Sequence, residues 1–368
     1  MSAFINRIGT AVPAHDIHVA FIAFARTMLT DDKTRTVFDR MAERSGIAHR
    51  HSHMRPGDLA SGEVDAGGFY QRGNFPSTGA RMRDYEPNAL DLALASVARL
   101  DLGCELSAVT DVIVASCSGF SAPGLDLQLA LRLGLRQDVG RMIVGFMGCS
   151  AAVPALRAAD AIVRAEAGAR VLVVNVELCS LHLRETADLE TALSFLLFGD
   201  GASAALVSSQ AVGVALGDFQ SRIIPDSADL ITWAIGDQGF EMHLSGKVPG
   251  RIADALRRAQ ARNTPDDLLR GRQAAEYDLW AVHAGGRTVL DAVEISLELP
   301  QTALASSRRV LREFGNMSSA TLMFVVGRSM SAKTGTPPAQ TTMLTTSAIV
   351  YGESTTVWPA RISPLTAR

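Results

Sequence analysis

One cysteine at the junction of a strand pattern and a helix pattern is the residue best placed for covalent chemistry. Cys149 lies in residues 145–150 (GFMGCS), between an apolar run and a long alanine-rich segment. The start of a helix exposes unpaired N–H groups and partial positive charge, which favour the thiolate over the thiol. The alternative interpretation is a small buried residue that fills a tight turn.

Two later junctions favour the catalytic interpretation. His283 follows an apolar run within residues 282–286 (VHAGG), and Asn316 lies in residues 315–320 (GNMSSA). Together, a cysteine, a histidine and an asparagine supply a nucleophile, a base or donor, and a neutral donor. The three residues therefore predict an enzyme that transfers acyl groups.

The composition restricts the partners of the protein. The 368-residue chain carries a net charge of −3 and no long basic run, which argues against nucleic acid and anionic membranes. None of its four cysteines forms a CxxC pair, as is typical of reduced thiols in the cytoplasm. We find no signal-peptide layout and no apolar stretch of about 20 residues, so we expect a soluble, cytoplasmic protein.

Short apolar runs alternate with longer helical patterns, which is typical of an α/β fold. The apolar runs predict central strands covered on both faces, at residues 111–115, 141–146, 171–176, 202–207, 278–282 and 321–326. Helices are expected at residues 88–99, 125–133, 150–166, 250–260, 288–294 and 306–314. Because the helix at 150–166 is rich in alanine, we expect it to be buried and to hold Cys149 rigidly.

The alternation runs twice along the chain, which predicts two halves, at residues 1–210 and 211–368. Cys149 belongs to the first half, whereas His283 and Asn316 belong to the second. We therefore expect a site assembled across one cleft between the halves. Residues 331–346 contain two prolines and several threonines, and predict a loop or a frayed tail.

Several motifs in the same order resemble the bacterial-type type III polyketide synthases, the chalcone and stilbene synthase family. They are residues 10–13 (TAVP), 119–124 (GFSAPG), 145–149 (GFMGC), 197–202 (LFGDGA), 280–286 (WAVHAGG) and 315–320 (GNMSSA). The resemblance extends from about residue 8 to about residue 327. It implies a thiolase-like, five-layered αβαβα fold made of two similar halves, and a homodimer.

The same resemblance implies a reaction that needs no metal and no cofactor. A starter acyl-CoA would acylate Cys149, and malonyl-CoA would lose CO₂ to give an enolate held by His283 and Asn316. His283 beside Cys149 would form a thiolate–imidazolium pair and lower the thiol pKa below its free value of about 8.5. Repeated extension and cyclisation would give a pyrone, a resorcinol or a phloroglucinol-like product.

Other positions match family residues that line the substrate cavity. Phe198 matches a phenylalanine between the CoA tunnel and the cavity, and Met242 stands near the position of a second one. Trp233 is bulky, so it is a candidate for limiting the length of the product. The remaining matches are Cys117, Cys179, His182 and Ser318, and packing in the core is the alternative role for each of them, favoured for the two cysteines.

A basic segment matches the cations that the family places at the mouth of the CoA tunnel. Arg40, Arg44 and Arg50 are the candidates for contacts with CoA phosphates. The run of residues 49–53 (HRHSH) also permits a less favoured metal site, because alternate residues of a strand share one face.

The C-terminus departs from the family. A glycine-rich GFGPG loop near the active site has its counterpart in residues 350–354 (VYGES), where one glycine matches. Two alternatives therefore stay open beside the iterative synthase. One is a ketoacyl synthase that performs a single condensation with an acyl-carrier protein, and the other is a catalytically silent subunit.

Overall fold

The computed structural model describes residues 2–58, 63–217, 219–331, 341–351 and 354–363. Ten of its described strands form one large sheet, in which nine follow the order β12-β13-β14-β8-β1-β7-β6-β4-β5 and β9 (Gln220–Arg222) pairs with β14. The short strand β8 (Gly213–Ala215) pairs with both β1 and β14 and so joins two parts of the sheet.

The first part of the sheet carries the strand that leads to Cys149. It consists of β1 (Phe4–Ala11), β4 (Asp111–Ser116), β5 (Gly140–Gly145), β6 (Arg170–Leu178) and β7 (Asp200–Ser208). β4 is parallel to β5 and to β6, whereas β7 is antiparallel to both β6 and β1. In β6, residues 171–178 are all buried, as expected for a strand covered on both faces.

The second part of the sheet carries the strand that leads to His283. It consists of β12 (Leu279–Val282), β13 (Thr341–Tyr351) and β14 (Ser354–Ser363). β12 and β13 are parallel, and β13 and β14 are antiparallel with Tyr351 opposite Ser354.

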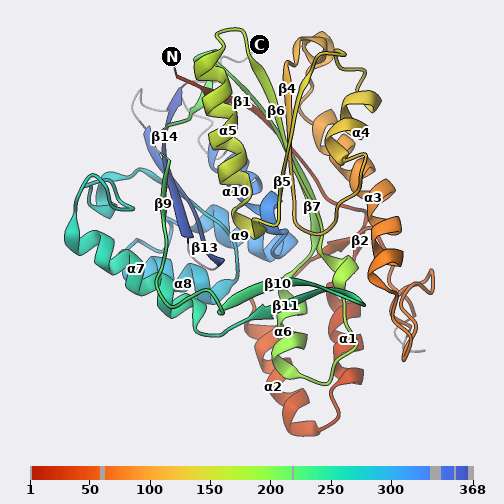
Figure 1. Ribbon diagram of the computed structural model, residues 1–368. Coiled ribbons are helices and arrows are strands. Elements are labelled where there is room, and N and C mark those ends of the chain that lie inside the picture. Colours follow the sequence, from red (N-terminus) through yellow and green to blue (C-terminus); the bar gives the residue numbers. More distant parts are fainter. Residues whose placement is uncertain (1, 59–62, 218, 332–340, 352–353, 364–368) are drawn as a thin grey trace.

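Helices cover and separate the two parts of the sheet, which gives five layers (Figure 1). The outer helices on one side are α3 (Thr78–Ala98) and α4 (Leu125–Arg132). Between the two parts lie α5 (Ala152–Ala165) and α10 (Thr321–Ser331), and the outer helices on the other side are α7 (Val248–Arg262), α8 (Arg287–Ser296) and α9 (Ala305–Phe314). The predicted αβαβα architecture is confirmed.

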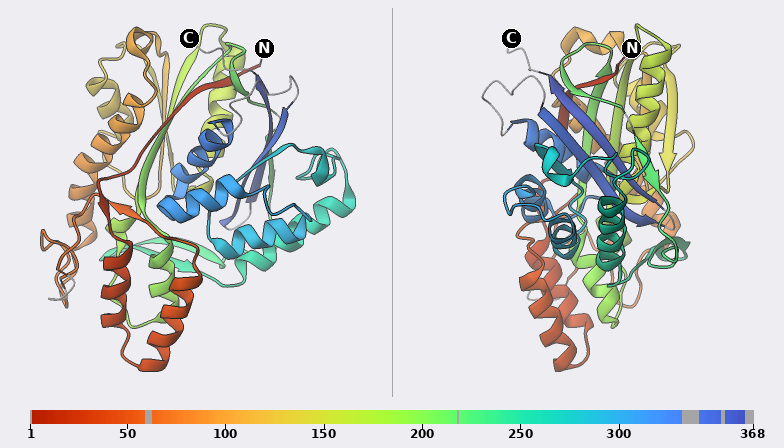
Figure 2. Two further views of the ribbon diagram at one scale, coloured as in Figure 1. Left: turned by 180° about the vertical axis from the view of Figure 1, so that it is seen from behind. Right: turned by 90° about the vertical axis from the view of Figure 1, so that its left-hand side faces the viewer.

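A helical lobe lies below this layered body (Figures 1 and 2). It contains α1 (His18–Met28), α2 (Asp32–Arg44) and α6 (Leu189–Leu197). Two small sheets lie apart from the large one: β2 (His15–Asp16) pairs with β3 (His51–Ser52), and β10 (Ile231–Gly236) forms a hairpin with β11 (Gly239–Leu244). The apolar side chains of α1 and α6 pack together around Phe38 of α2, so the lobe has a core of its own.

Two expectations about the strands are wrong. Residues 321–326 begin helix α10 and do not form a strand, because an apolar run buried on every side carries no periodicity that separates helix from strand. Strand β5 was expected to be central, but it is an edge strand whose Met142 and Ile143 side chains are 43% and 47% exposed.

Candidate active site

Cys149 lies in a short turn between the end of β5 and the start of α5. Phe146 has φ 53° and Gly148 also has φ 53°, and a 3₁₀ turn over Gly148–Ser150 precedes the helix. A bulky residue in the left-handed region is uncommon, and such backbone is typical of functional turns. The turn directs Cys149 toward the residues that follow α9.

Asn316 is held beside Cys149 by hydrogen bonds of its backbone and its side chain. Its N–H donates to the carbonyl of Leu197 at 2.8 Å, and its own carbonyl accepts from the N–H of Gly199 at 3.0 Å. The side-chain Oδ1 accepts from the N–H of Ser318 at 2.9 Å, and Nδ2 donates to the carbonyl of Gly285 at 3.3 Å. The same Oδ1 lies 3.8 Å from Sγ of Cys149, so the two predicted residues meet.

His283 directly follows β12 and is 2% exposed. Neither of its ring nitrogens has a hydrogen-bond partner among the described residues. Burial lowers the pKa of His283 to about 3, so the imidazole is neutral at physiological pH. A buried imidazole without a partner has one N–H free to donate and one lone pair free to accept, which suits proton transfer and binding of an oxyanion.

The thiol of Cys149 differs from the expectation. Burial raises the pKa of Cys149 to about 11, and the hydrogen bonds that the thiol makes with Ser318 and Asn316 oppose this rise. Thiol and imidazole are therefore both neutral in this structure, and the predicted fall of the thiol pKa is not observed.

A small cavity surrounds the thiol, and six of the seven predicted pocket residues line it. Its free volume is about 30 Å³, which is room for about two water molecules. Its lining consists of Cys117, Ser118, Cys149, Cys179, Phe195, Phe198, Trp233, Met242 and Ser318. Cys117 and Cys179, for which a core role was favoured, thus face the same space as Cys149.

The wall opposite the thiol is built from the β10–β11 hairpin. Trp233 and Met242 are cross-strand partners, and the Trp233 indole N–H donates to the carbonyl of Cys117 at 2.7 Å. His182 does not line the cavity but lies behind this wall, with its ring centroid 5.1 Å from that of Trp233. Its Nε2–H donates to the carbonyl of Ser118 at 2.6 Å, so it supports the cavity from outside.

Sequence reasoning missed three residues of the site. Phe195 lies one helical turn before Phe198, and Ser118 follows Cys117; both line the cavity. Glu177 is fully buried and accepts hydrogen bonds from the N–H groups of Cys117 and Ser118 and from the Ser118 and Ser319 hydroxyls. Burial raises the pKa of Glu177. A lone glutamate inside an apolar strand pattern is the signal that predicts such a buried acceptor.

A much larger pocket, of about 890 Å³, lies on the other side of the last turn of α6. Arg44 and Arg287 line this pocket, and so do Leu197 and Gly285. The first turn of α8 also borders it, and the start of a helix binds anions well. Of the three predicted CoA-binding arginines, Arg44 is in the wall, whereas Arg40 is exposed on α2 and is not part of the lining.

The prediction that Arg50 binds phosphate is wrong. Arg50 is 1% exposed, and its guanidinium donates to the carbonyls of Phe195 and Phe198. A side chain covered in this way cannot reach a phosphate in solvent.

The three histidines of residues 49–53 do not share a face. His49 bonds to Asp16, and His51 bonds to the carbonyl of Pro13. His53 lies between Asp84 and Asp200, and no metal-binding group of histidine, cysteine and carboxylate side chains occurs in the described part of the chain.

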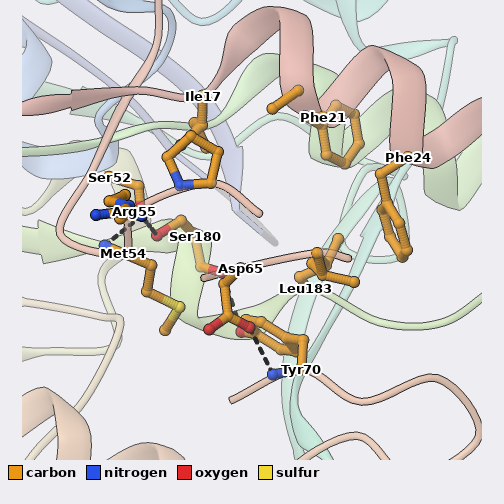
Figure 3. Close-up of a pocket in the computed structure, with 13 residues that line it drawn as sticks. Ile17, Phe21, Phe24, Ser52, Met54, Arg55, Asp65, Tyr70, Ser180 and Leu183 are labelled. Carbon is orange, nitrogen blue, oxygen red and sulfur yellow. Dashed lines mark hydrogen bonds between the residues drawn. The ribbon is translucent and has the colours of Figure 1, made fainter. Parts of the chain in front are cut away.

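A second small cavity, of about 50 Å³, lies between α1 and the segment after β3 (Figure 3). Figure 3 shows Phe21 and Phe24 on one side and Asp65 and Tyr70 on the other. The hydroxyl of Ser180 in its wall bonds to Ser52 at 2.7 Å. This cavity is separate from the one around the thiol.

The divergent tail is described in part. Gly352 and Glu353, at the centre of the expected counterpart of the glycine-rich loop, lie outside the described residues. The strands on either side of them pair as β13 and β14.

The layered fold fits an acyl-transferring condensing enzyme, and so does the approach of the Cys149 thiol to Asn316, whose side chain also bonds to Gly285, two residues after His283. Residues 2–211 match the N-terminal domain of the chalcone and stilbene synthases, and residues 216–345 match the C-terminal domain. The chain belongs to this family and is a polyketide synthase. None of its helices, in the parts that the structure describes, is long and apolar enough to cross a membrane.

Solved structures share the fold over nearly the whole chain. PKS-I from the brown alga Ectocarpus siliculosus is 27% identical, with a TM-score of 0.86 and 98% of both chains covered. The C-terminal type III polyketide synthase domain of Steely1, a type I/III hybrid from Dictyostelium, is 22% identical, with a TM-score of 0.86 over 98% of this chain and 99% of that chain. CsyB complexed with CoA-SH is 21% identical, with a TM-score of 0.84 over 98% of this chain and 100% of that chain.

Proposed function

We propose that the protein is an iterative type III polyketide synthase that extends an acyl-CoA starter with malonyl-CoA. The observation that carries the proposal is the approach of Cys149 Sγ, which borders the small cavity, to Oδ1 of Asn316. Because the cavity is small, we favour a pyrone, the product that needs the fewest extensions. A single-condensation enzyme is the second candidate, favoured by the same small volume.

The first step loads the starter. The Cys149 thiol gives its proton to His283 while its sulfur attacks the thioester carbon, and the CoA thiolate leaves with that proton. His283 is neutral at physiological pH, so its ring keeps a free lone pair that can accept the thiol proton.

The second step forms the carbon–carbon bond. Malonyl-CoA loses CO₂, and negative charge develops on its thioester oxygen as the enolate forms. Nδ2–H of Asn316 and an N–H of His283 stabilise this oxygen, because preorganised donors act strongly in a buried site. The enolate carbon then attacks the thioester carbon on Cys149, and the released thiolate is ready for another cycle.

The larger pocket suits the CoA portion of both substrates. It borders Leu197, which directly precedes Phe198, and Gly285, which lies two residues after His283. Arg44, Arg287 and the start of α8 supply positive charge for the phosphates, and no cofactor is required by this chemistry. CsyB, a protein of the same fold, binds CoA-SH, which supports the assignment.

Incubation with malonyl-CoA and a series of acyl-CoA starters, with mass analysis of the products, tests the proposed function. We expect products with two or more added ketide units, and none from Cys149→Ala, which lacks the nucleophile. A product with one added unit would favour the single-condensation enzyme. Absence of both CO₂ and product with every starter would contradict both candidates.

We expect Trp233→Gly to lengthen the product by at least one ketide unit. The indole fills the wall opposite Cys149, and its removal enlarges a cavity that holds about two water molecules. The measurement is the distribution of product masses from one starter. His243→Ala, which alters a neighbouring β11 residue outside the cavity lining, is the control. Unchanged product masses for Trp233→Gly would show that this wall does not limit chain length.

The family also suggests a homodimer, and β5 suits the interface. This edge strand exposes Met142 and Ile143, and Phe120 and Met147 are also more than 40% exposed. An apolar strand at the edge of a sheet is a template for pairing with a second strand. Sedimentation equilibrium should give twice the mass of one chain, and a stable monomer would contradict the dimer.

A further inference from the structure

Arg50 is a buried cation with an unusual set of partners. Its Nη1 donates to the carbonyl of Phe195 at 2.8 Å and to that of Phe198 at 2.6 Å. Nε donates to Nδ1 of His18 at 3.0 Å, and the guanidinium lies 4.7 Å from the ring centroid of Phe21. Burial lowers the pKa of Arg50 to about 9, so the side chain is charged at neutral pH.

The carbonyls that Arg50 binds belong to the end of α6. The last carbonyls of a helix have no partner within the helix and carry partial negative charge. In this helix the N–H of Gly199 donates to the carbonyl of Asn316, so it does not bond back to Phe195. Arg50 supplies the missing donors and places a positive charge at the negative end of the helix.

This end of α6 separates the two pockets of the proposed reaction. The side chains of Phe195 and Phe198 line the cavity around the thiol, whereas Leu196 and Leu197 line the larger pocket. The wall between the nucleophile and the CoA pocket is therefore one helical turn, and Arg50 is bound to both of its inner residues.

Arg50 also packs against the loop that carries Asn316. A Cβ atom on Gly315 would lie 2.8 Å from Cγ of Arg50 and 2.8 Å from the carbonyl of Leu197, so the loop lies directly against the arginine. Asn316 and α6 are bonded to each other through Leu197 and Gly199. One side chain thus supports both the wall and the catalytic amide.

We propose that Arg50 is a positioning residue that holds Asn316 and the wall formed by Phe195 and Phe198 in the geometry required for decarboxylative condensation. This inference rests on the proposed function. His18 completes the arrangement by accepting from Nε of Arg50 as a neutral imidazole. A displacement of about 1 Å in a catalytic group costs roughly 100-fold in rate.

Arg50→Met tests this role because it keeps the length of the side chain and removes the charge and the donors. The rate of starter loading on Cys149, measured by the mass of the intact protein, should stay within about fivefold of the wild-type rate. The reason is that Arg50 touches neither the thiol nor His283. Condensation should fall by roughly 100-fold, and CO₂ release without product should rise as a share of turnover. Arg50→Lys keeps the charge and should recover part of the condensation rate, with less CO₂ released without product.

Arg81→Met is the matched control. Arg81 is also fully buried and donates to backbone carbonyls, those of Pro76, Leu181 and Leu183, none of which belongs to a residue lining the catalytic cavity. Its loss should lower thermal stability without changing the ratio of condensation to loading. If Arg50→Met and Arg81→Met give the same ratio, the positioning role is overturned.

A second measurement tests the role of Arg50 even if the proposed function is wrong. If the wild-type protein does not decarboxylate malonyl-CoA, the proposed function fails, and the rate of Cys149 alkylation by iodoacetamide then tests Arg50 without any acyl-CoA. We expect Arg50→Met to raise this rate by about threefold, because a loosened wall of Phe195 and Phe198 exposes the thiol, and Arg81→Met to leave it near wild type. Equal rates in the two variants would overturn the inference on this measure as well.

Discussion

Asn316→Asp should lower malonyl-CoA decarboxylation by roughly 100- to 1000-fold, the usual effect of losing one oxyanion donor. Aspartate keeps the size of the side chain and the oxygen that accepts from the N–H of Ser318. It replaces the Nδ2–H donor with a carboxylate oxygen, which repels the developing enolate. The same negative charge, near Sγ of Cys149, also disfavours the thiolate.

The measurement is CO₂ release from malonyl-CoA by protein that has been loaded with starter. Loading should suffer less than decarboxylation, because attack on the starter depends on Cys149 and His283. Asn175→Ala, which removes another fully buried amide, from β6, controls for lost stability and should retain decarboxylation per folded molecule. A variant Asn316→Asp that decarboxylates at the wild-type rate would remove Asn316 from the proposed mechanism.

The three proposed catalytic positions stand out in the sequence because each lies where a strand or helix ends in a glycine-containing turn. Cys149 follows β5, His283 follows β12, and Asn316 follows α9. Such turns are marked in the sequence by their glycines. The order of the motifs along the chain also matches that of the family. The sequence alone therefore indicates the positions to which we assign the proposed nucleophile and donors.

Burial and environment were not predictable in the same way. The resemblance to the family places cations at the mouth of the CoA tunnel, and charged residues are normally exposed, so the sequence predicts a phosphate contact for Arg50. Its actual partners are carbonyls about 145 positions away in sequence, which only the folded chain brings near. The raised pKa of Cys149 has the same origin, because it depends on how much of the fold covers the thiol.

Tertiary structure also decides whether residues 321–326 form a helix or a strand and whether β5 lies at the centre or the edge of the sheet. Residues 321–326 are apolar throughout, and such a run suits a buried strand or a buried helix equally well. β5 has the apolar composition of a central strand, yet it lies at the sheet edge. An apolar edge is consistent with a partner that the sequence of one chain does not show, namely the second subunit proposed above.

His53 gives a prediction for stability, because its imidazole is held between two carboxylates. Nδ1 lies 3.1 Å from Oδ2 of Asp200, and Nε2 lies 2.6 Å from Oδ2 of Asp84. A ring that faces carboxylates at both nitrogens donates twice and is therefore an imidazolium. Burial opposes the charge, but the hydrogen bonds to Asp200 and Asp84 outweigh it and raise the pKa of His53 to about 9.

Because the pKa in the folded state lies above the unfolded value of about 6.5, this group stabilises the protein fully below pH 6.5. The stabilisation is lost as the pH rises through about 9. The shift corresponds to roughly 3 kcal/mol in the free energy of unfolding. Asp200 also accepts from the N–H and the hydroxyl of Ser180, so the pair stabilises the turn that carries Cys179.

His53→Gln, compared with wild type by denaturant unfolding at about pH 6 and about pH 10, measures this contribution. We expect the variant to be less stable by roughly 3 kcal/mol at the lower pH and nearly equal to wild type at the higher pH, because wild-type His53 is neutral there. His49→Gln, at an exposed histidine that pairs with Asp16, should show little difference at either pH. If His53→Gln lowers the free energy of unfolding equally at both pH values, His53 stabilises the fold by packing alone, without its charge.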